Sequence, residues 1–123
     1  MKLQITEIVD RGDAERERLV MKAKDDVDIG DFAIFMARSS KEGKARSGNV
    51  PHCYWFEDKE IKTGATVVLY TKAGKRSEKE NPSGNTSYFF YWGLEAPAWT
   101  ESTRPVLVYA PDWKIFRWQT AEG

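Results

Sequence analysis

Eight short runs of β-type residues, spread along the whole chain, most constrain what this protein can fold into. These runs are rich in β-branched and aromatic residues and show the two-residue alternation of strands. They cover 3–9, 18–23, 32–37, 53–56, 66–71, 87–92, 105–110 and 114–118. The best helical stretch, 13–18, has no apolar stripe, and we expect only a short turn capped by Asp13 there. Because no helix is available to connect parallel strands, the pattern predicts an antiparallel β-sandwich or barrel.

Alternation predicts which sides of these strands are apolar. In the run 18–23, one side carries Leu19, Met21 and Ala23. The run 32–37 is apolar on both sides. One side carries Phe32, Ile34 and Met36, and the other carries Ala33, Phe35 and Ala37.

Five consecutive aromatic residues, 88–92, form the most unusual strand. Alternation places Tyr88, Phe90 and Trp92 on one side and Phe89 and Tyr91 on the other. One set is expected in the core, and the other is then covered or exposed. We expect the edge near Tyr91, with Trp99 beside it, to reach the surface. The aromatic set is extended by Trp113 and Trp118.

Two long polar connections, 38–50 and 72–86, separate the predicted strands. Loops of this length inside a compact domain are usually functional or disordered. Both are locally basic, through Arg38, Lys41, Lys44 and Arg46 in the first and Lys72, Lys75, Arg76 and Lys79 in the second. If the two loops share one end of the fold, they form a single positive rim.

Turn signals separate the other strands. Asp25 and Asp26 are expected to accept local backbone hydrogen bonds, and Gly30 is expected to adopt a positive φ. The sequence Lys-Thr-Gly at 62–64 predicts a turn, and so does Pro-Asp at 111–112.

Length and composition favour one domain, 1–123, in a cytoplasmic protein. The chain has 123 residues, 19 basic and 19 acidic, so it has no global field that attracts nucleic acid or membranes. Its single cysteine, Cys53, excludes an intrachain disulfide, and no apolar stretch approaches the roughly 20 residues that span a bilayer. We expect neither a signal peptide nor membrane association.

The sequence contains no catalytic or cofactor signature. His52 and Cys53 are adjacent, but neighbouring side chains on a strand point to opposite faces, so a nucleophile–base pair is not expected. We expect a buried thiol and a partly exposed imidazole. A structural zinc site needs about four Cys or His ligands, and the acidic stretch 25–31 lacks the closing glutamate of a calcium loop. We therefore predict no metal, no cofactor and no enzymatic activity.

The order of these segments resembles that of the lamin-tail domain. The segments that carry the resemblance are LQITEI (3–8), ERLVMK (17–22), VDIGDFAI (27–34), the hairpin 56–70 with IKTG before TVVLY, and VLVYAPDWKI (106–115). The resemblance implies an immunoglobulin-like antiparallel β-sandwich of about eight strands with little or no helix. It also implies a non-catalytic module that binds protein or DNA.

The leading functional hypothesis is a module that contacts a macromolecule, most often a protein, through an aromatic face and the two polar loops. Exposed aromatic clusters commonly mark binding sites. The binding residues that we predict are Trp55, Tyr88, Tyr91, Trp92, Trp99, Arg38, Lys72 and Arg76. Self-association is included in this hypothesis. Two alternatives are nucleic-acid binding through the basic loops 38–50 and 72–86, and binding of a small molecule or carbohydrate in a pocket lined by Trp55, Tyr88, Trp92 and Trp99.

Overall fold

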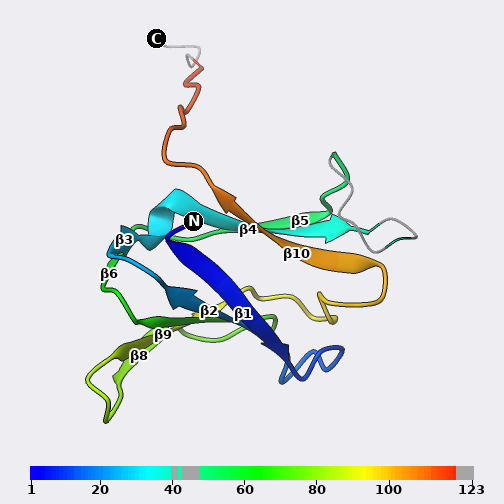
Figure 1. Ribbon diagram of the computed structural model, residues 1–123. Coiled ribbons are helices and arrows are strands. Elements are labelled where there is room, and N and C mark those ends of the chain that lie inside the picture. The colour runs from blue at the N-terminus through cyan, green and yellow to red at the C-terminus, as the bar shows by residue number, and fades with distance from the viewer. Residues whose placement is uncertain (40–41, 43–47, 119–123) are drawn as a thin grey trace.

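The computed structural model describes residues 1–39, 42 and 48–118, which form an all-β sandwich (Figure 1). One layer is a five-stranded sheet in the order β1-β2-β7-β9-β8. The facing layer is a three-stranded sheet in the order β10-β4-β5, and a third, small sheet pairs β3 with β6. The strands are β1 (Leu3–Val9), β2 (Arg18–Ala23), β3 (Val27–Asp28), β4 (Phe32–Arg38), β5 (His52–Trp55), β6 (Glu60–Ile61), β7 (Thr66–Tyr70), β8 (Ser77–Glu80), β9 (Thr86–Tyr91) and β10 (Thr103–Tyr109). The predicted all-β class is confirmed.

The five-stranded sheet is mixed, which corrects the expectation of a fully antiparallel sandwich. β7 and β9 pair in parallel, with Leu69 opposite Phe90. No helix connects them, because β8 runs back along the far side of β9 and pairs with it antiparallel. β8 lies within the segment 72–86, which the sequence predicts to be a loop. The sequence of this strand, SEKE, is polar and each residue is exposed, as is common in charged edge strands, so it lacks the apolar alternation that predicts a strand.

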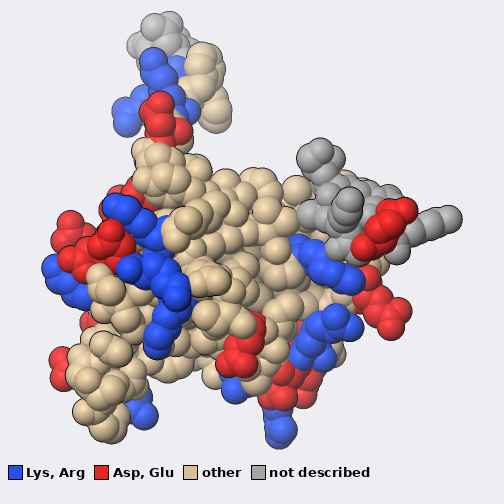
Figure 2. All heavy atoms as spheres, in the orientation of Figure 1, with Lys and Arg blue, Asp and Glu red and all other residues tan. Residues whose placement is uncertain are grey.

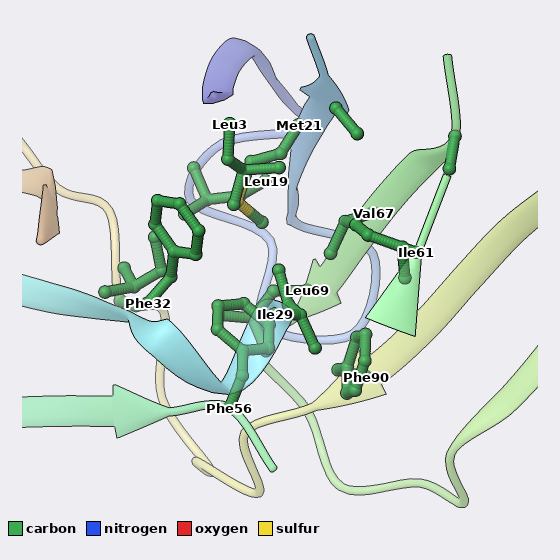
Figure 3. Close-up of a cluster of buried hydrophobic side chains, with 14 of the residues drawn as sticks. Leu3, Leu19, Met21, Ile29, Phe32, Phe56, Ile61, Val67, Leu69 and Phe90 are labelled. Atoms are coloured by element: carbon green, nitrogen blue, oxygen red, sulfur yellow. The ribbon is translucent and has the colours of Figure 1, made fainter. Parts of the chain in front are cut away.

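Apolar side chains from both main sheets fill the space between them (Figure 3). They occupy alternate positions on their strands, as a sheet with one buried face requires. The buried cluster includes Leu3, Leu19, Met21, Ala23, Ile29, Phe32, Ile34, Phe56, Ile61, Val67, Leu69 and Phe90. The inward orientation of one side of 18–23 is thereby confirmed.

The aromatic strand β9 divides as its alternation predicts. The ring of Phe90 is buried with its centroid 5.0 Å from that of Phe56, and Tyr88 and Trp92 pack against the same core. Phe89 and Tyr91 are half-buried on the outward side of the sheet. The Tyr91 ring stacks on Tyr70 of the neighbouring strand, with 5.1 Å between centroids and 8° between planes.

Two predicted turns form as expected. The carbonyl of Asp13 accepts hydrogen bonds from the N–H groups of residues 16 and 17, and its Oδ1 accepts one from Glu15 at 3.0 Å. Asp25 accepts the expected local bond, from the Asp26 N–H at 2.8 Å. The Asp26 carboxylate instead accepts bonds from the N–H and the hydroxyl of Thr63, 37 residues away, and these bonds lower the pKa of the Asp26 carboxyl. Gly64, which follows, has a φ of 87°.

The expectation of a positive φ at Gly30 is wrong, because this glycine serves a close approach instead. Gly30 lies in the short 3-10 turn η1 (Ile29–Asp31) and does not adopt the left-handed conformation. A Cβ at this position would lie 2.0 Å from Oδ1 of Asp58 and 2.8 Å from its Cα. The connection between β5 and β6 can therefore pass close to the backbone of Gly30 because glycine has no Cβ.

The predicted strand 114–118 does not form. Residues 111–118 have no regular structure and are exposed throughout. The last backbone contact before them is the hydrogen bond from the Ala110 N–H to the carbonyl of Asp31, at 2.7 Å. Beyond it, no described strand lies beside the segment to pair with it. None of the described segments is a helix with the length and apolar character that a membrane span needs.

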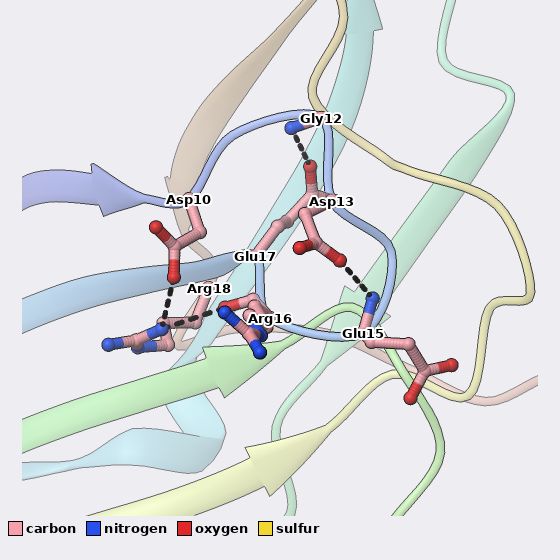
Figure 4. Close-up of polar contacts among 7 residues, drawn as sticks. All are labelled: Asp10, Gly12, Asp13, Glu15, Arg16, Glu17 and Arg18. Atoms are coloured by element: carbon pink, nitrogen blue, oxygen red, sulfur yellow. Dashed lines mark hydrogen bonds and ion pairs between the residues drawn. The ribbon is translucent and has the colours of Figure 1, made fainter.

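A buried carboxylate fastens three connections of the sandwich. Glu17, just before β2, is fully buried, and its Oε2 accepts hydrogen bonds from the hydroxyl of Thr71 and from the N–H of Ala98 at 2.6 Å. Its Oε1 accepts bonds from the N–H of Gly12 at 2.9 Å (Figure 4) and from that of Trp99 at 3.4 Å. The carboxylate thus holds residues 98–99 against the core.

Candidate binding surface

The outward side of the three-stranded sheet is almost entirely apolar. On β4, the side chains of Phe32, Ile34 and Met36 enter the core, so the alternate positions face outward. Their cross-strand partners on β5 and β10 share that side. We call this set the outer face. It consists of Ala33, Phe35, Ala37, Cys53, Trp55, Val106 and Val108, with one charged residue, Arg104, opposite Ala37. The two-sided apolar pattern of 32–37 therefore leaves one apolar side without a covering layer in the described chain.

Trp55 marks one end of the outer face. Its side chain is 50% exposed, and its indole N–H donates a hydrogen bond to the Gly30 carbonyl at 3.0 Å, which fixes the ring orientation. The Trp113 ring contacts it edge-on, with 5.0 Å between centroids and an angle of 89°. Tyr109, the last residue of β10, is also 50% exposed, but it pairs with the core residue Phe32, 5.1 Å away between ring centroids, and so lies at the end of the inner side of the sheet. An aromatic cluster therefore stands where β10 ends.

Residues 111–118, which we call the aromatic segment, continue from that cluster into solvent. Figure 1 shows the segment leaving the sandwich on the side opposite the five-stranded sheet. Its large apolar side chains are 58–79% exposed, namely Trp113, Ile115, Phe116 and Trp118. In the described chain, every exposed large apolar side chain except Met1 belongs to this segment or to Trp55 and Tyr109. Such a concentration of exposed apolar groups is typical of an interaction site.

Acidic side chains lie on the segments 28–31 and 58–60, which adjoin the start of the aromatic segment at Asp31 and Gly30, whereas the aromatic segment carries Lys114, Arg117 and one acid, Asp112. We call these acids the acidic rim, and they are Asp28, Asp31, Asp58 and Glu60. Asp31 accepts the backbone bond from Ala110, and Asp58 abuts Gly30, whose carbonyl binds Trp55. The ion pairs within the described residues do not include any of the four. Figure 2 shows the segment projecting from the body with charged groups of both signs near its base.

The predicted exposure of Trp99 is wrong. Its side chain is 1% exposed, and its ring lies 5.9 Å from that of Trp92, inside the sandwich. The bonds from Glu17 to the backbone of residues 98 and 99 draw this loop inward. Tyr91 is half-buried on the opposite sheet, so the predicted pair does not form a common surface.

The four aromatic residues of the predicted small-molecule pocket do not converge either. Trp55 lies on the outer face, Trp99 is buried, and Trp92 packs against the core. Tyr88 lines a hollow of about 120 Å³ together with Lys59, Arg76, Ser77, Glu78 and Phe90, and this hollow contains no tryptophan.

The predicted basic residues occupy different environments. Lys72 and Arg18 lie over the Tyr70 ring, 5.4 and 5.7 Å from its centroid. Arg76 pairs with Glu57 at 2.9 Å, while Arg38 is exposed at the end of β4. The other basic residues of the first loop, at 41, 44 and 46, lie outside the described residues. A single positive rim therefore stays a prediction.

His52 and Cys53 do not form a reactive pair. Cys53 faces Phe35 on the outer face, whereas His52 lies opposite Met36, on the other side of the sheet. The expected burial of Cys53 is wrong: the thiol is exposed, because none of the residues that the structure describes forms a layer over the outer face. Partial desolvation by the neighbouring strand raises its pKa, which makes the reactive thiolate rarer. In the described part of the chain, no three His, Cys, Asp or Glu side chains are placed to hold a metal ion.

The binding residues predicted from the sequence do not include the aromatic segment. Its alternation suggested an ordinary strand. The signal that distinguishes it is that Pro111 and Asp112, where the predicted turn does not form, precede six residues of which four are large and apolar. Comparison with protein-family models and with curated proteins finds no match for this chain.

Proposed function

We propose that this protein is a non-enzymatic module that binds another protein through the outer face and the aromatic segment. The observation that carries the proposal is the concentration of exposed Trp, Phe and Ile side chains at Trp55 and in the aromatic segment. Aromatic residues on a rigid sheet dominate protein interfaces, because they bury a large area with little loss of side-chain freedom. The lamin-tail resemblance is part of this proposal, since it implies a binding module. So is a cytoplasmic location, which suits a chain with one cysteine.

A photo-crosslinking amino acid at position 116 tests the proposal. We expect the crosslinker to form discrete protein adducts when the protein is irradiated in its native cells, because Phe116, within the aromatic segment, is 79% exposed. The matched control carries the same group at Ser83, an exposed position in the β8–β9 turn. The adducts are identified by mass spectrometry. Equal labelling from both positions, or no protein adduct from position 116, would contradict the proposal.

Nucleic-acid binding is the second candidate, and one observation favours it. The stacked rings of Tyr70 and Tyr91 lie on the outward side of the five-stranded sheet with Lys72 and Arg18 beside them. Cations next to aromatic rings on a sheet suit a single-stranded nucleic acid.

This second candidate predicts that labelled single-stranded DNA or RNA binds at low salt, with an affinity that falls steeply as salt increases. The double variant Lys72→Glu and Lys79→Glu should weaken binding by about ten-fold or more, since each change reverses a charge near the phosphate backbone. Lys114→Glu, on the other side of the sandwich, is the control and should not matter. A fluorescence anisotropy titration measures both. If no binding occurs at low salt, this candidate is removed.

A further inference from the structure

We propose that the occupant of the outer face is a second copy of the same chain, with the aromatic segment of each copy laid across the outer face of the other. The inference rests on the proposed function and names the partner of the same site. Three properties of the described residues support it: the position, the length and the charge of the segment.

The position of the segment makes the surface self-complementary. A two-fold dimer uses the same patch on both copies, so the donating and receiving parts of that patch must lie close together on each copy. Here the aromatic segment, which would be donated, begins at the edge of the outer face, which would receive it. Ala110 is bonded to Asp31, and Trp113 already contacts Trp55 at the edge of the outer face. An unrelated partner would not require this adjacency.

The length and pattern of the segment match the surface that it would cover. Eight residues in an extended conformation span about 26 Å, and the seven residues of β10 span about 23 Å. In an extended conformation the segment would carry apolar residues on both sides, with Trp113 and Ile115 on one side and Phe116 and Trp118 on the other. In a two-fold dimer each segment lies between two outer faces, so both of its sides are covered. If the segment were covered on one side only, the apolar side chains on its other side would remain exposed to water.

Charge supports the same arrangement. Lys114 and Arg117 give the segment two cations against one acid, Asp112, and the acidic rim lies near the base of the segment on each copy. When the segments are exchanged, these cations reach the rim of the other copy. Such complementary charges fix the register of a contact more than they add to its affinity.

Sedimentation equilibrium of the purified full chain over a wide concentration range tests the inference. We expect a monomer–dimer equilibrium. Phe116→Asp should raise the dissociation constant by about ten-fold or more, since it places an unpaired charge in an apolar contact. Ser83→Asp adds the same charge at a distant exposed turn and should leave the constant unchanged. Val106→Asp, on the outer face of β10, should weaken the dimer as Phe116→Asp does. Circular dichroism verifies that each variant is folded.

The reactivity of Cys53 provides a second, independent test of the dimer, because Cys53 is the only cysteine of the chain and lies exposed on the outer face. In the dimer the partner's segment covers it, so the rate of its reaction with a thiol reagent should fall as the protein concentration rises. The rate should not depend on concentration in Phe116→Asp.

A chain that is monomeric at all concentrations overturns the inference, and so does a Cys53 rate that is independent of concentration in the native chain. If such a monomer still forms adducts with other proteins from position 116, the proposed function stands and only the identity of the partner is wrong. If position 116 forms no protein adduct at all, the proposed function itself fails.

Discussion

Replacing Glu17 with glutamine should lower the free energy of unfolding by about 3 kcal/mol. The carboxylate is fully buried and accepts hydrogen bonds from Thr71, Ala98, Gly12 and Trp99, three of them from backbone N–H groups. A glutamine keeps the shape but presents an NH₂ group to these donors, so at least one buried N–H loses its acceptor. Hydrogen bonds to charged groups contribute about 1.5–3 kcal/mol each, and an unsatisfied buried donor adds a further cost. Urea-induced unfolding measures the change.

The control for this substitution lies two residues earlier. Glu15 is exposed, and only its backbone N–H takes part in a hydrogen bond of the 13–17 turn. Glu15→Gln removes the same charge and should change the stability by less than about 0.5 kcal/mol. If both substitutions have the same small effect, the carboxylate does not fasten the three connections as described.

Trp99→Ala should destabilise the fold by about 3–5 kcal/mol, the range for removal of a large buried aromatic side chain. The indole is 1% exposed and contacts the Trp92 ring, so its removal leaves a cavity between the sheets. Trp118→Ala removes the same side chain from a position that is 79% exposed, and its effect on stability should stay within about 0.5 kcal/mol. Thermal and urea unfolding of the two variants give the comparison directly.

The same pair of variants separates structure from binding. Trp118→Ala should weaken the contact made by the aromatic segment while leaving the fold intact. Trp99→Ala should affect binding only through the loss of folded protein. A Trp99→Ala variant that is fully stable but fails to bind would contradict the burial of this side chain and restore it as a surface residue.

Much of the strand layout could be predicted, because alternation is a local property of the sequence. The division of 88–92 into an inward and an outward set follows from the strand period alone, and so does the two-sided apolar character of 32–37. The turn at 62–64 is held by Asp26, which lies 37 residues away in the sequence, but the Asp13 turn depends on a side chain that bonds to the backbone two residues further on. Such short-range interactions can be recognised without knowing which strands become neighbours.

The candidate site was less predictable, because exposure depends on what the rest of the chain covers. Trp99 and Trp118 are the same residue type, yet Glu17 draws the loop of Trp99 into the core while nothing described lies beside Trp118. Cysteine is a residue type that is commonly buried, but Cys53 faces outward on a sheet that no further layer of the described chain covers. The parallel pairing of β7 with β9 likewise depends on where the polar strand β8 returns.

Local periodicity therefore determines the strands of this protein and the two chemical sides of each, because both depend on residues only a few positions apart. Contacts between distant parts of the chain decide which of those sides is buried. The hydrogen bonds of Glu17 join residues more than fifty positions apart, and the outer face is assembled from three strands spread over most of the chain. The pattern within a single strand carries no information about contacts with distant residues. Only the folded structure therefore shows that the exposed apolar surface lies around Trp55 and the aromatic segment.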